Sequence, residues 1–308
     1  MKRRVKSILC MLAAVLLLLS GGAVTAQASS VEETGVADTI EVFGREADPN
    51  AELLDLNGIP LQGTAQVEEI LHLFPNLKQV EMCGCGISNE DMAALRRKYP
   101  DIKFVWEVTV CKGIKVRTDI TYFMAFQHGI SENFIGDYSN LKYCPDIELI
   151  DCGHYRVADI SFVTELPKLK YLLLCDGILE DLSPIGDCTS LEFLELFVNP
   201  VDDFAPLLNL TNLVDLNISY TAFGKTSGNN YSYTGAFGDI TPLYHMTWLD
   251  RLWICNSRLP QEELDALQAA LVHTIIQTQS SSSTDRGWRH SPHYFQGRDI
   301  LGSPYMIA

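Results

Sequence analysis

Positive charge is scarce in this chain of 308 residues. Its 23 lysines and arginines stand against 39 aspartates and glutamates, which gives a formal net charge of −16. A surface this acidic repels the phosphates of nucleic acids and the headgroups of anionic lipids. We therefore expect no nucleic-acid partner.

The common signatures of catalysis are also missing. The sequence contains no glycine-rich phosphate loop, no G-x-S-x-G and no H-E-x-x-H. Its seven histidines are scattered, and the closest pair, His290 and His293, supplies only two ligands for a metal ion. We therefore expect a chain that is not an enzyme and that holds no metal and no cofactor.

Long apolar runs are limited to one, residues 8–19, which is too short to cross a bilayer easily. Four positive residues lie within the first six positions, and residues 26–28 (Ala-Gln-Ala) offer a cleavage site of small residues. This order is typical of a secretory signal peptide. We expect residues 1–28 to be removed near Ala28, which leaves a mature chain of charge −20 with no membrane span, secreted or associated with the cell envelope.

What the chain has instead is a repeat. Motifs of the form L-x-x-L-x-L, with conservative replacements, begin at Ile147, Leu169, Leu191, Leu213 and Leu249. The first four starts are 22 residues apart, and the fifth follows after one further period plus a 14-residue insertion. Alternation in L-x-L predicts short strands whose leucines point inward, and such units must stack into a parallel sheet to bury them.

These motifs resemble the leucine-rich repeat family. Endings of the form D-I/L-x-P-L/I, such as residues 181–185 and 239–243, make them similar to the bacterial internalin type. The resemblance covers residues 48–276, most strongly 147–259. It implies an α/β fold: a curved leucine-rich repeat solenoid with a parallel concave sheet, helical segments on the convex side, a helical cap at the C-terminus and a role in binding.

The rest of the chain fits around this domain. Residues 29–47 are expected to form a leader or a short cap, and residues 277–308 a serine-rich hinge and a C-terminal tail. Thr64 and Asn89 are expected to cap two convex helices, and residues 260–276 to form the capping helix. A degenerate repeat is expected somewhere in residues 112–146, with residues 122–126 as its candidate strand.

Eight cysteines remain after cleavage, which in an exported protein suggests disulfides. The register argues against most pairings, because Cys144 and Cys188 lie two repeats apart, roughly 10 Å at the spacing of stacked strands, and a bridge spans about 7 Å at most. We expect most of them to be small buried fillers. A bridge between Cys83 and Cys111 stays open.

Residues between the inward leucines are expected to point onto the concave face. The candidate binding residues there are Trp106, Asp151, Tyr171, Leu173, Phe193, Glu195, Phe197, Asp215, Tyr220 and Trp253. An apolar centre with an acidic rim is typical of a contact surface. The insertion, residues 224–238, adds Tyr231, Tyr233 and Phe237 in a setting that resembles a recognition loop. Alternatively, the C-terminal segment folds over this face and buries it.

The sequence therefore predicts a secreted, non-catalytic recognition module that binds an extracellular protein or glycan through the concave face. The first alternative is a structural or self-assembling envelope protein, whose face is covered by a neighbouring subunit or by its own tail. A remote alternative is a thiol-dependent enzyme, because the register places Cys175, His154 and Asp176 close together.

Overall fold

The computed structural model describes residues 39–130, 135–221, 238–279 and 287–301, together with the backbone of residues 223–227 and 230–233. The predicted signal peptide lies outside these residues. The chain divides into two compact units, residues 1–104 and 105–308. Each unit is described by itself, and the single repeat domain 48–276 stays a prediction. No helix in the described part is both long and apolar enough to cross a membrane.

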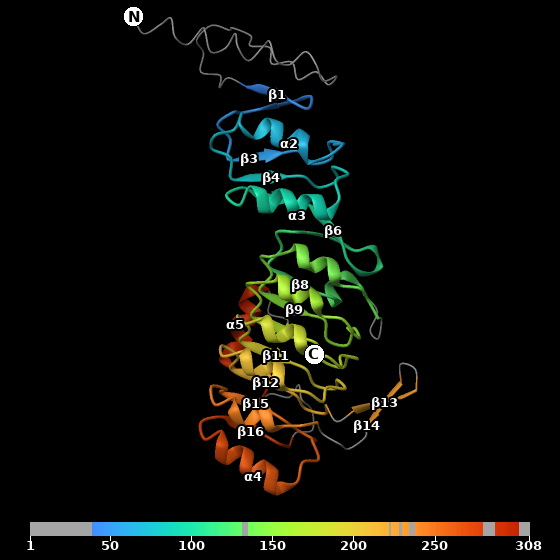
Figure 1. Ribbon diagram of the computed structural model, residues 1–308, viewed down its shortest axis with the longest axis vertical. Helices are drawn as coiled ribbons and strands as arrows, with labels where there is room; N and C mark the ends of the chain where they lie inside the picture. Colours follow the sequence, from blue (N-terminus) through green and yellow to red (C-terminus); the bar gives the residue numbers. More distant parts are fainter. Residues whose placement is uncertain are drawn as a thin grey trace, which may run out of the picture. The chain divides into compact units, whose positions relative to one another are not determined.

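The first unit contains a small parallel sheet with helices beside it. A hairpin of β1 (Ile40–Val42) and β2 (Arg45–Ala47) precedes three strands, β3 (Leu53–Asp55), β4 (Gln79–Glu81) and β5 (Lys103–Val105). The helices α2 (Thr64–Leu71) and α3 (Asn89–Lys98) connect these strands (Figure 1). Leu54 and Val80 lie side by side in the register and are buried, as the repeat pattern predicts.

Both predicted helix caps in this unit are wrong by one residue. Thr64 is the first helical residue after Gly63, which makes no side-chain cap, and Ser88 caps α3 by accepting a hydrogen bond of 3.1 Å from the Asp91 N–H. Ser88 has the extended backbone that a capping residue needs, so its hydroxyl reaches the first turn where Asn89 cannot.

The second unit is built on a sheet of seven parallel strands. Their order is β16-β15-β12-β11-β10-β9-β8. Their bounds are Ile275–Gln277, Arg251–Trp253, Asp215–Asn217, Phe193–Glu195, Tyr171–Leu173, Leu149–Asp151 and Tyr122–Met124. The central register aligns one inward residue from each predicted repeat, and all five are fully buried: Ile150, Leu172, Leu194, Leu216 and Leu252. The predicted leucine-rich repeat solenoid is confirmed.

Short 3-10 helices return the chain between these strands. They are η3 (Ser139–Tyr143), η4 (Ser161–Glu165), η5 (Ser183–Asp187), η6 (Ala205–Asn209) and η7 (Thr241–His245). An aspartate precedes each of them and accepts a hydrogen bond of 2.8 Å from the backbone N–H two residues further on; these are Asp137, Asp159, Asp181, Asp203 and Asp239. The repeated aspartate of the D-I/L-x-P endings is therefore a turn residue.

The remaining strands and the helix α4 complete or change the predicted arrangement of elements. The degenerate repeat is β8, which lies at the expected position and pairs with β9. The predicted helix 260–276 is too long, because α4 (Gln261–Ala270) ends and the chain returns to the sheet as β16, where the Thr274 hydroxyl donates to the Leu249 carbonyl at 2.7 Å. The insertion carries a hairpin of β13 (Phe223–Ser227) and β14 (Asn230–Tyr233). Earlier in the chain, β6 (Glu107–Thr109) pairs with β7 (Lys115–Arg117) in a second antiparallel hairpin.

Each of the five predicted repeats also places one residue in the left-handed backbone region, three residues after the end of its strand. These residues are His154, Asp176, Val198, Tyr220 and Asn256, with φ between 51° and 66°. Asparagine and aspartate tolerate this conformation, whereas a β-branched residue is strained in it. Val198, with φ 58°, is therefore the strained member of this column.

Replacing Val198 by asparagine is expected to stabilise the second unit by about 1 kcal/mol, because the strain of a left-handed valine is of that order. Urea unfolding of the variant and the parent measures this difference. Asn256→Val, the reverse change at the equivalent position, is the matched control and is expected to destabilise by a similar amount. Equal stability of Val198→Asn and parent would show that the turn carries no strain.

The eight cysteines in the described residues are free thiols, and seven of them are buried, as predicted for small fillers. Cys83 and Cys111 form no bridge. Cys85 donates its S–H to the Leu56 carbonyl of the preceding repeat at 3.1 Å, so it bonds to the neighbouring turn.

Candidate functional site

The concave face, defined as the side of the seven-stranded sheet opposite the inward leucines, carries the predicted columns. The register aligns Tyr171, Phe193, Asp215 and Arg251 in one column. Leu173, Glu195, Asn217 and Trp253 form the next. Polar and aromatic side chains are thereby fixed about one strand spacing apart on a rigid sheet.

A second segment lies on this face. Residues 287–301, which we call the C-terminal segment, include the helix α5 (Pro292–Ile300) and cross the strands of the second unit (Figure 1). Its Trp288, Tyr294 and Leu301 are buried in one cluster with the concave-face residues Met124, Leu149, Tyr171, Leu173, Phe193, Trp253 and Cys255. The concave aromatic surface is therefore the floor of an intramolecular interface.

Aromatic rings form the centre of this interface. The ring of Phe193 lies 4.9 Å from that of Trp288 and 6.0 Å from that of Tyr294, measured between centroids. Trp253 lies 5.8 Å from Trp288. Such tilted pairs add to the free energy gained by burying the rings.

Gly297 lies where α5 packs tightly against the sheet. A Cβ atom at this position would lie 2.9 Å from Cδ1 of the Tyr171 ring. A larger residue at position 297 therefore has no room unless the helix moves away from the face.

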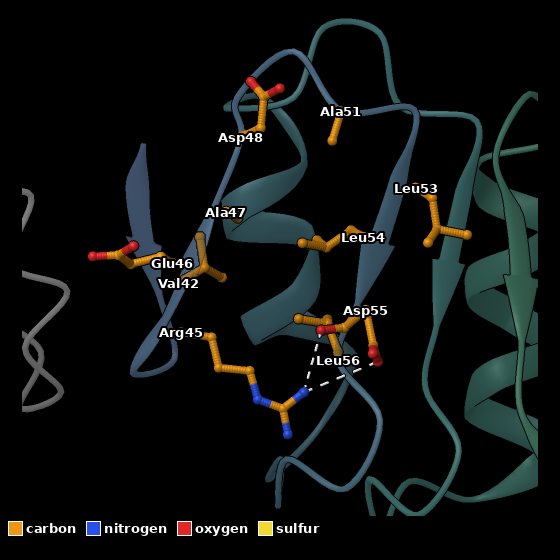
Figure 2. Close-up of a pocket in the computed structure, with 10 residues that line it drawn as sticks. All are labelled: Val42, Arg45, Glu46, Ala47, Asp48, Ala51, Leu53, Leu54, Asp55 and Leu56. Carbon is orange, nitrogen blue, oxygen red and sulfur yellow. Dashed lines mark hydrogen bonds and ion pairs between the residues drawn. The ribbon is translucent and has the colours of Figure 1, made fainter. Parts of the chain in front are cut away.

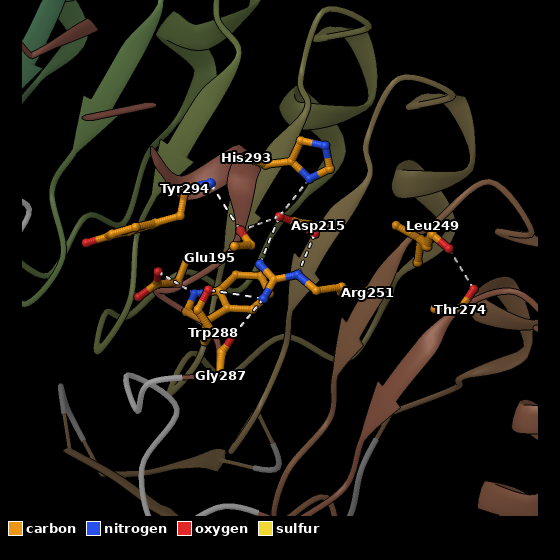
Figure 3. A network of polar contacts seen from close by, with 10 residues as sticks. Glu195, Asp215, Leu249, Arg251, Thr274, Gly287, Trp288, His293 and Tyr294 are labelled. Atoms are coloured by element: carbon orange, nitrogen blue, oxygen red, sulfur yellow. Dashed lines mark hydrogen bonds and ion pairs between the residues drawn. The ribbon is translucent and has the colours of Figure 1, made fainter. Parts of the chain in front are cut away.

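Glu195 is the first of two buried acidic groups under the C-terminal segment. Its carboxylate is fully inaccessible to solvent and accepts a hydrogen bond from Trp288 Nε1 at 2.8 Å (Figure 3). It also accepts one from Arg289 Nη2 at 3.0 Å. A buried carboxylate needs such partners to offset the loss of water.

Asp215 is the second, and it is also fully buried. Arg251, on the neighbouring strand, holds it with two bonds of 2.8 Å, from Nε and Nη2. From the C-terminal segment, the Ser291 hydroxyl donates to Asp215 Oδ2 at 3.2 Å, and His293 Nδ1 lies 3.2 Å from the same oxygen (Figure 3). Arg251 also donates to the carbonyls of Gly287 and Trp288, at 2.8 and 3.1 Å.

These contacts correct the expectation that the candidate residues face solvent. Tyr171, Leu173, Phe193, Glu195, Asp215 and Trp253 are buried and contact or lie beneath the C-terminal segment, and Phe197 is buried as well. The alternative, that this segment folds over the face, describes the structure. The outward orientation of the columns was right, but a segment distant in the sequence covers them.

The remaining candidates are dispersed. Trp106 is buried beside Tyr143 and precedes β6, outside the seven-stranded sheet, so it does not lie on the concave face as expected. Tyr220 is half-buried against the cluster. Only the backbone of Tyr231 and Tyr233 is described, in β14, and Phe237 lies outside the described residues.

Asp151, at the end of β9, has a perturbed acidity. Burial raises the pKa of its carboxyl to about 6, and the nearby Glu195 adds to this, against a hydrogen bond from the Gly153 N–H. Because the folded state holds the proton more tightly than the unfolded chain, Asp151 lowers stability increasingly as the pH rises from about 4 to about 6.

Asp151→Asn is therefore expected to stabilise the chain by roughly 1–2 kcal/mol at pH 7 and to leave its stability nearly unchanged at pH 4. Asparagine keeps the oxygen that accepts from Gly153 but carries no charge. Unfolding in urea at both pH values tests this. A variant that is less stable than the parent at pH 7 would contradict the raised pKa.

The thiol-dependent alternative is disfavoured by the state of its nucleophile. His154 Nδ1 and Asp176 Oδ2 lie 3.0 Å apart, so the predicted neighbours do meet. Cys175, however, is buried, and its burial holds the pKa of the thiol well above the usual value. A protonated thiol without access to solvent is a poor nucleophile. The described residues also contain no group of three or more side chains suited to a metal ion.

A pocket in the first unit was not predicted from the sequence. It has a volume of about 310 Å³ and lies between the β1–β2 hairpin and β3 (Figure 2). Arg45 closes one side by donating to the carbonyls of Asn57 and Asp55, at 2.8 and 3.4 Å. Arg45 therefore binds Asp55, another residue that lines the pocket.

A scan against family models and a search of curated proteins found no match. Among solved structures, an internalin from Listeria monocytogenes is 15% identical over 69% of this chain, which spans half of that protein's length, with a TM-score of 0.40. Internalin C2 from the same organism is 18% identical over 74% of this chain and 80% of its own, with a TM-score of 0.36. A leucine-rich repeat protein of Leptospira interrogans is 14% identical over 73% of this chain and 54% of its own, with a TM-score of 0.36.

Two of these proteins are described as internalins and the third as a leucine-rich repeat protein. The overall similarity scores are low. The leucine-rich repeat architecture of this chain accordingly rests on its own strands, which pair in parallel with a 22-residue register.

Proposed function

We propose that the chain is a secreted, non-catalytic recognition module that binds an extracellular protein through the concave face of its second unit. One observation carries this proposal: the face binds a separate aromatic and basic segment through side-chain contacts to Phe193, Glu195 and Asp215. An aromatic centre combined with charged hydrogen-bond acceptors is the composition of a recognition surface. A protein is favoured over a glycan because the group bound there is itself a peptide.

The test compares binding to arrays of extracellular proteins and glycans. The variants are Gly297→Leu, designed to move the C-terminal segment off the face, and Gly297→Leu combined with Phe193→Ser. We expect the first to bind a protein partner and the second to lose it. Partners bound equally by both variants, or by neither, would show that the concave face is not the recognition surface.

A structural, self-assembling role is the second candidate. It is favoured by Ile275, in the terminal strand β16, and by Val272, shortly before it, which are 66% and 69% exposed. A strand edge flanked by exposed apolar residues can pair with another chain. Sedimentation at increasing protein concentration tests this, with Val272→Ser/Ile275→Ser as the comparison; self-association that this variant abolishes would support the structural role.

A further inference from the structure

The concave-face residues that contact the C-terminal segment are held in position without it. Asp215 is oriented by two hydrogen bonds from Arg251, and both residues lie on strands whose register fixes them. Phe193 and Glu195 share the neighbouring strand. If the segment left, these groups would keep their positions, so the face is a preorganised binding surface.

The C-terminal segment supplies a complementary group for each of these concave-face residues. Trp288 provides a ring for Phe193 and an N–H for Glu195, Arg289 provides the positive charge, and Ser291 provides a hydroxyl for Asp215. Two further contacts, from Arg251 to the backbone carbonyls of Gly287 and Trp288, are available to any peptide. The face therefore selects an aromatic residue followed by a cation.

One polar group of the C-terminal segment lacks a hydrogen-bond partner among the described residues. The Nε atom of Arg289 is buried and makes no hydrogen bond within the described part of the chain. An unsatisfied buried donor costs about 1–3 kcal/mol. This cost favours release of the segment and leaves room for a peptide that positions its cation better.

We propose that the concave face is a receptor for an aromatic and basic peptide segment of a partner protein. In the structure, residues 287–301 of the same chain occupy the site where this segment would bind. This inference rests on the proposed function and names its ligand. An external peptide reaches the face only in the fraction of molecules whose own segment has left, so its apparent affinity falls in proportion to that fraction. A tethered segment competes at an effective concentration on the order of millimolar.

The test uses a fluorescent synthetic peptide of residues 287–301 and measures its anisotropy with the full chain. We expect it to bind Gly297→Leu at least about 10-fold more tightly than the parent, because a leucine side chain at position 297 of the chain's own segment cannot fit against Tyr171. Gln296→Leu, at the exposed neighbouring position, is the matched control and should behave as the parent. A peptide carrying Arg289→Ala should bind Gly297→Leu about 10-fold more weakly than the unaltered peptide.

A folded Gly297→Leu chain that does not bind the peptide overturns the inference, and so does binding that is insensitive to Arg289→Ala in the peptide. If Gly297→Leu does not fold, Arg289→Gln in the chain, which loosens the segment without adding volume, is measured against the same criteria. A protein partner captured through Phe193 without any peptide binding would leave the proposed function standing and refute this ligand. Peptide binding without a partner that depends on Phe193 would support the ligand chemistry and refute the proposed function.

Discussion

Phe193→Ala is expected to destabilise the second unit by about 3–5 kcal/mol, the usual cost of deleting a phenylalanine from a packed core. The side chain is fully buried between the sheet and the C-terminal segment, in contact with Tyr171, Trp288 and Tyr294. Its removal leaves a cavity that neither a rigid sheet nor a tethered helix can easily fill. The free energy of unfolding in urea measures the effect.

Phe126→Ala is the control for this prediction. Phe126 belongs to the same unit and is 76% exposed, so its loss should change the free energy of unfolding by no more than about 0.5 kcal/mol. Equal effects of the two substitutions would show that Phe193 faces solvent, as the sequence alone had predicted.

Glu195→Gln is the second large effect, with an expected loss of about 3 kcal/mol or more. The substitution keeps an acceptor for the indole N–H of Trp288 but leaves the mostly buried Arg289 without its counter-charge. Removing one partner of a buried ion pair typically costs about 3–5 kcal/mol, whereas replacing both partners by apolar residues costs far less.

A double-mutant cycle separates these contributions. Glu195→Gln/Arg289→Met should be more stable than Glu195→Gln alone, because no buried charge remains. Lys170→Met, which breaks the half-exposed pair of Lys170 and Glu148, should cost less than about 1 kcal/mol. A double variant less stable than the Glu195→Gln single variant would argue that Arg289 is not buried against Glu195.

The repeat core could be predicted because its information is local. Each inward leucine follows its predecessor at a fixed period, and a slip by one residue would expose the whole set, so Leu172 and Leu194 could be paired from the sequence alone. The same register correctly predicted the columns of Tyr171, Phe193 and Asp215. Predicting strand β8 was also possible, because the length of chain before Ile147 had to contain one more unit.

The covering of the face is not encoded locally. The contact between Glu195 and Trp288 joins residues 93 positions apart, and no period relates the C-terminal segment to the repeats. One signal was available: an aromatic and basic segment in a chain of strong negative charge complements an aromatic and acidic face. Strand β16 was missed for a related reason, since Ile275 and Ile276 also fit the apolar pattern of the preceding helix.

The concave face is closed only if the C-terminal segment lies on it. Side-chain oxidation by hydroxyl radicals, read by mass spectrometry on the full chain, reports this position. We predict that Phe126 and Phe295, which are exposed, are oxidised readily, whereas Phe193, Trp288 and Tyr294 are protected. In Gly297→Leu the three protected residues should become reactive. Oxidation of Phe193 and Trp288 in the parent at rates close to that of Phe126 would contradict the account, because the concave face would then be open.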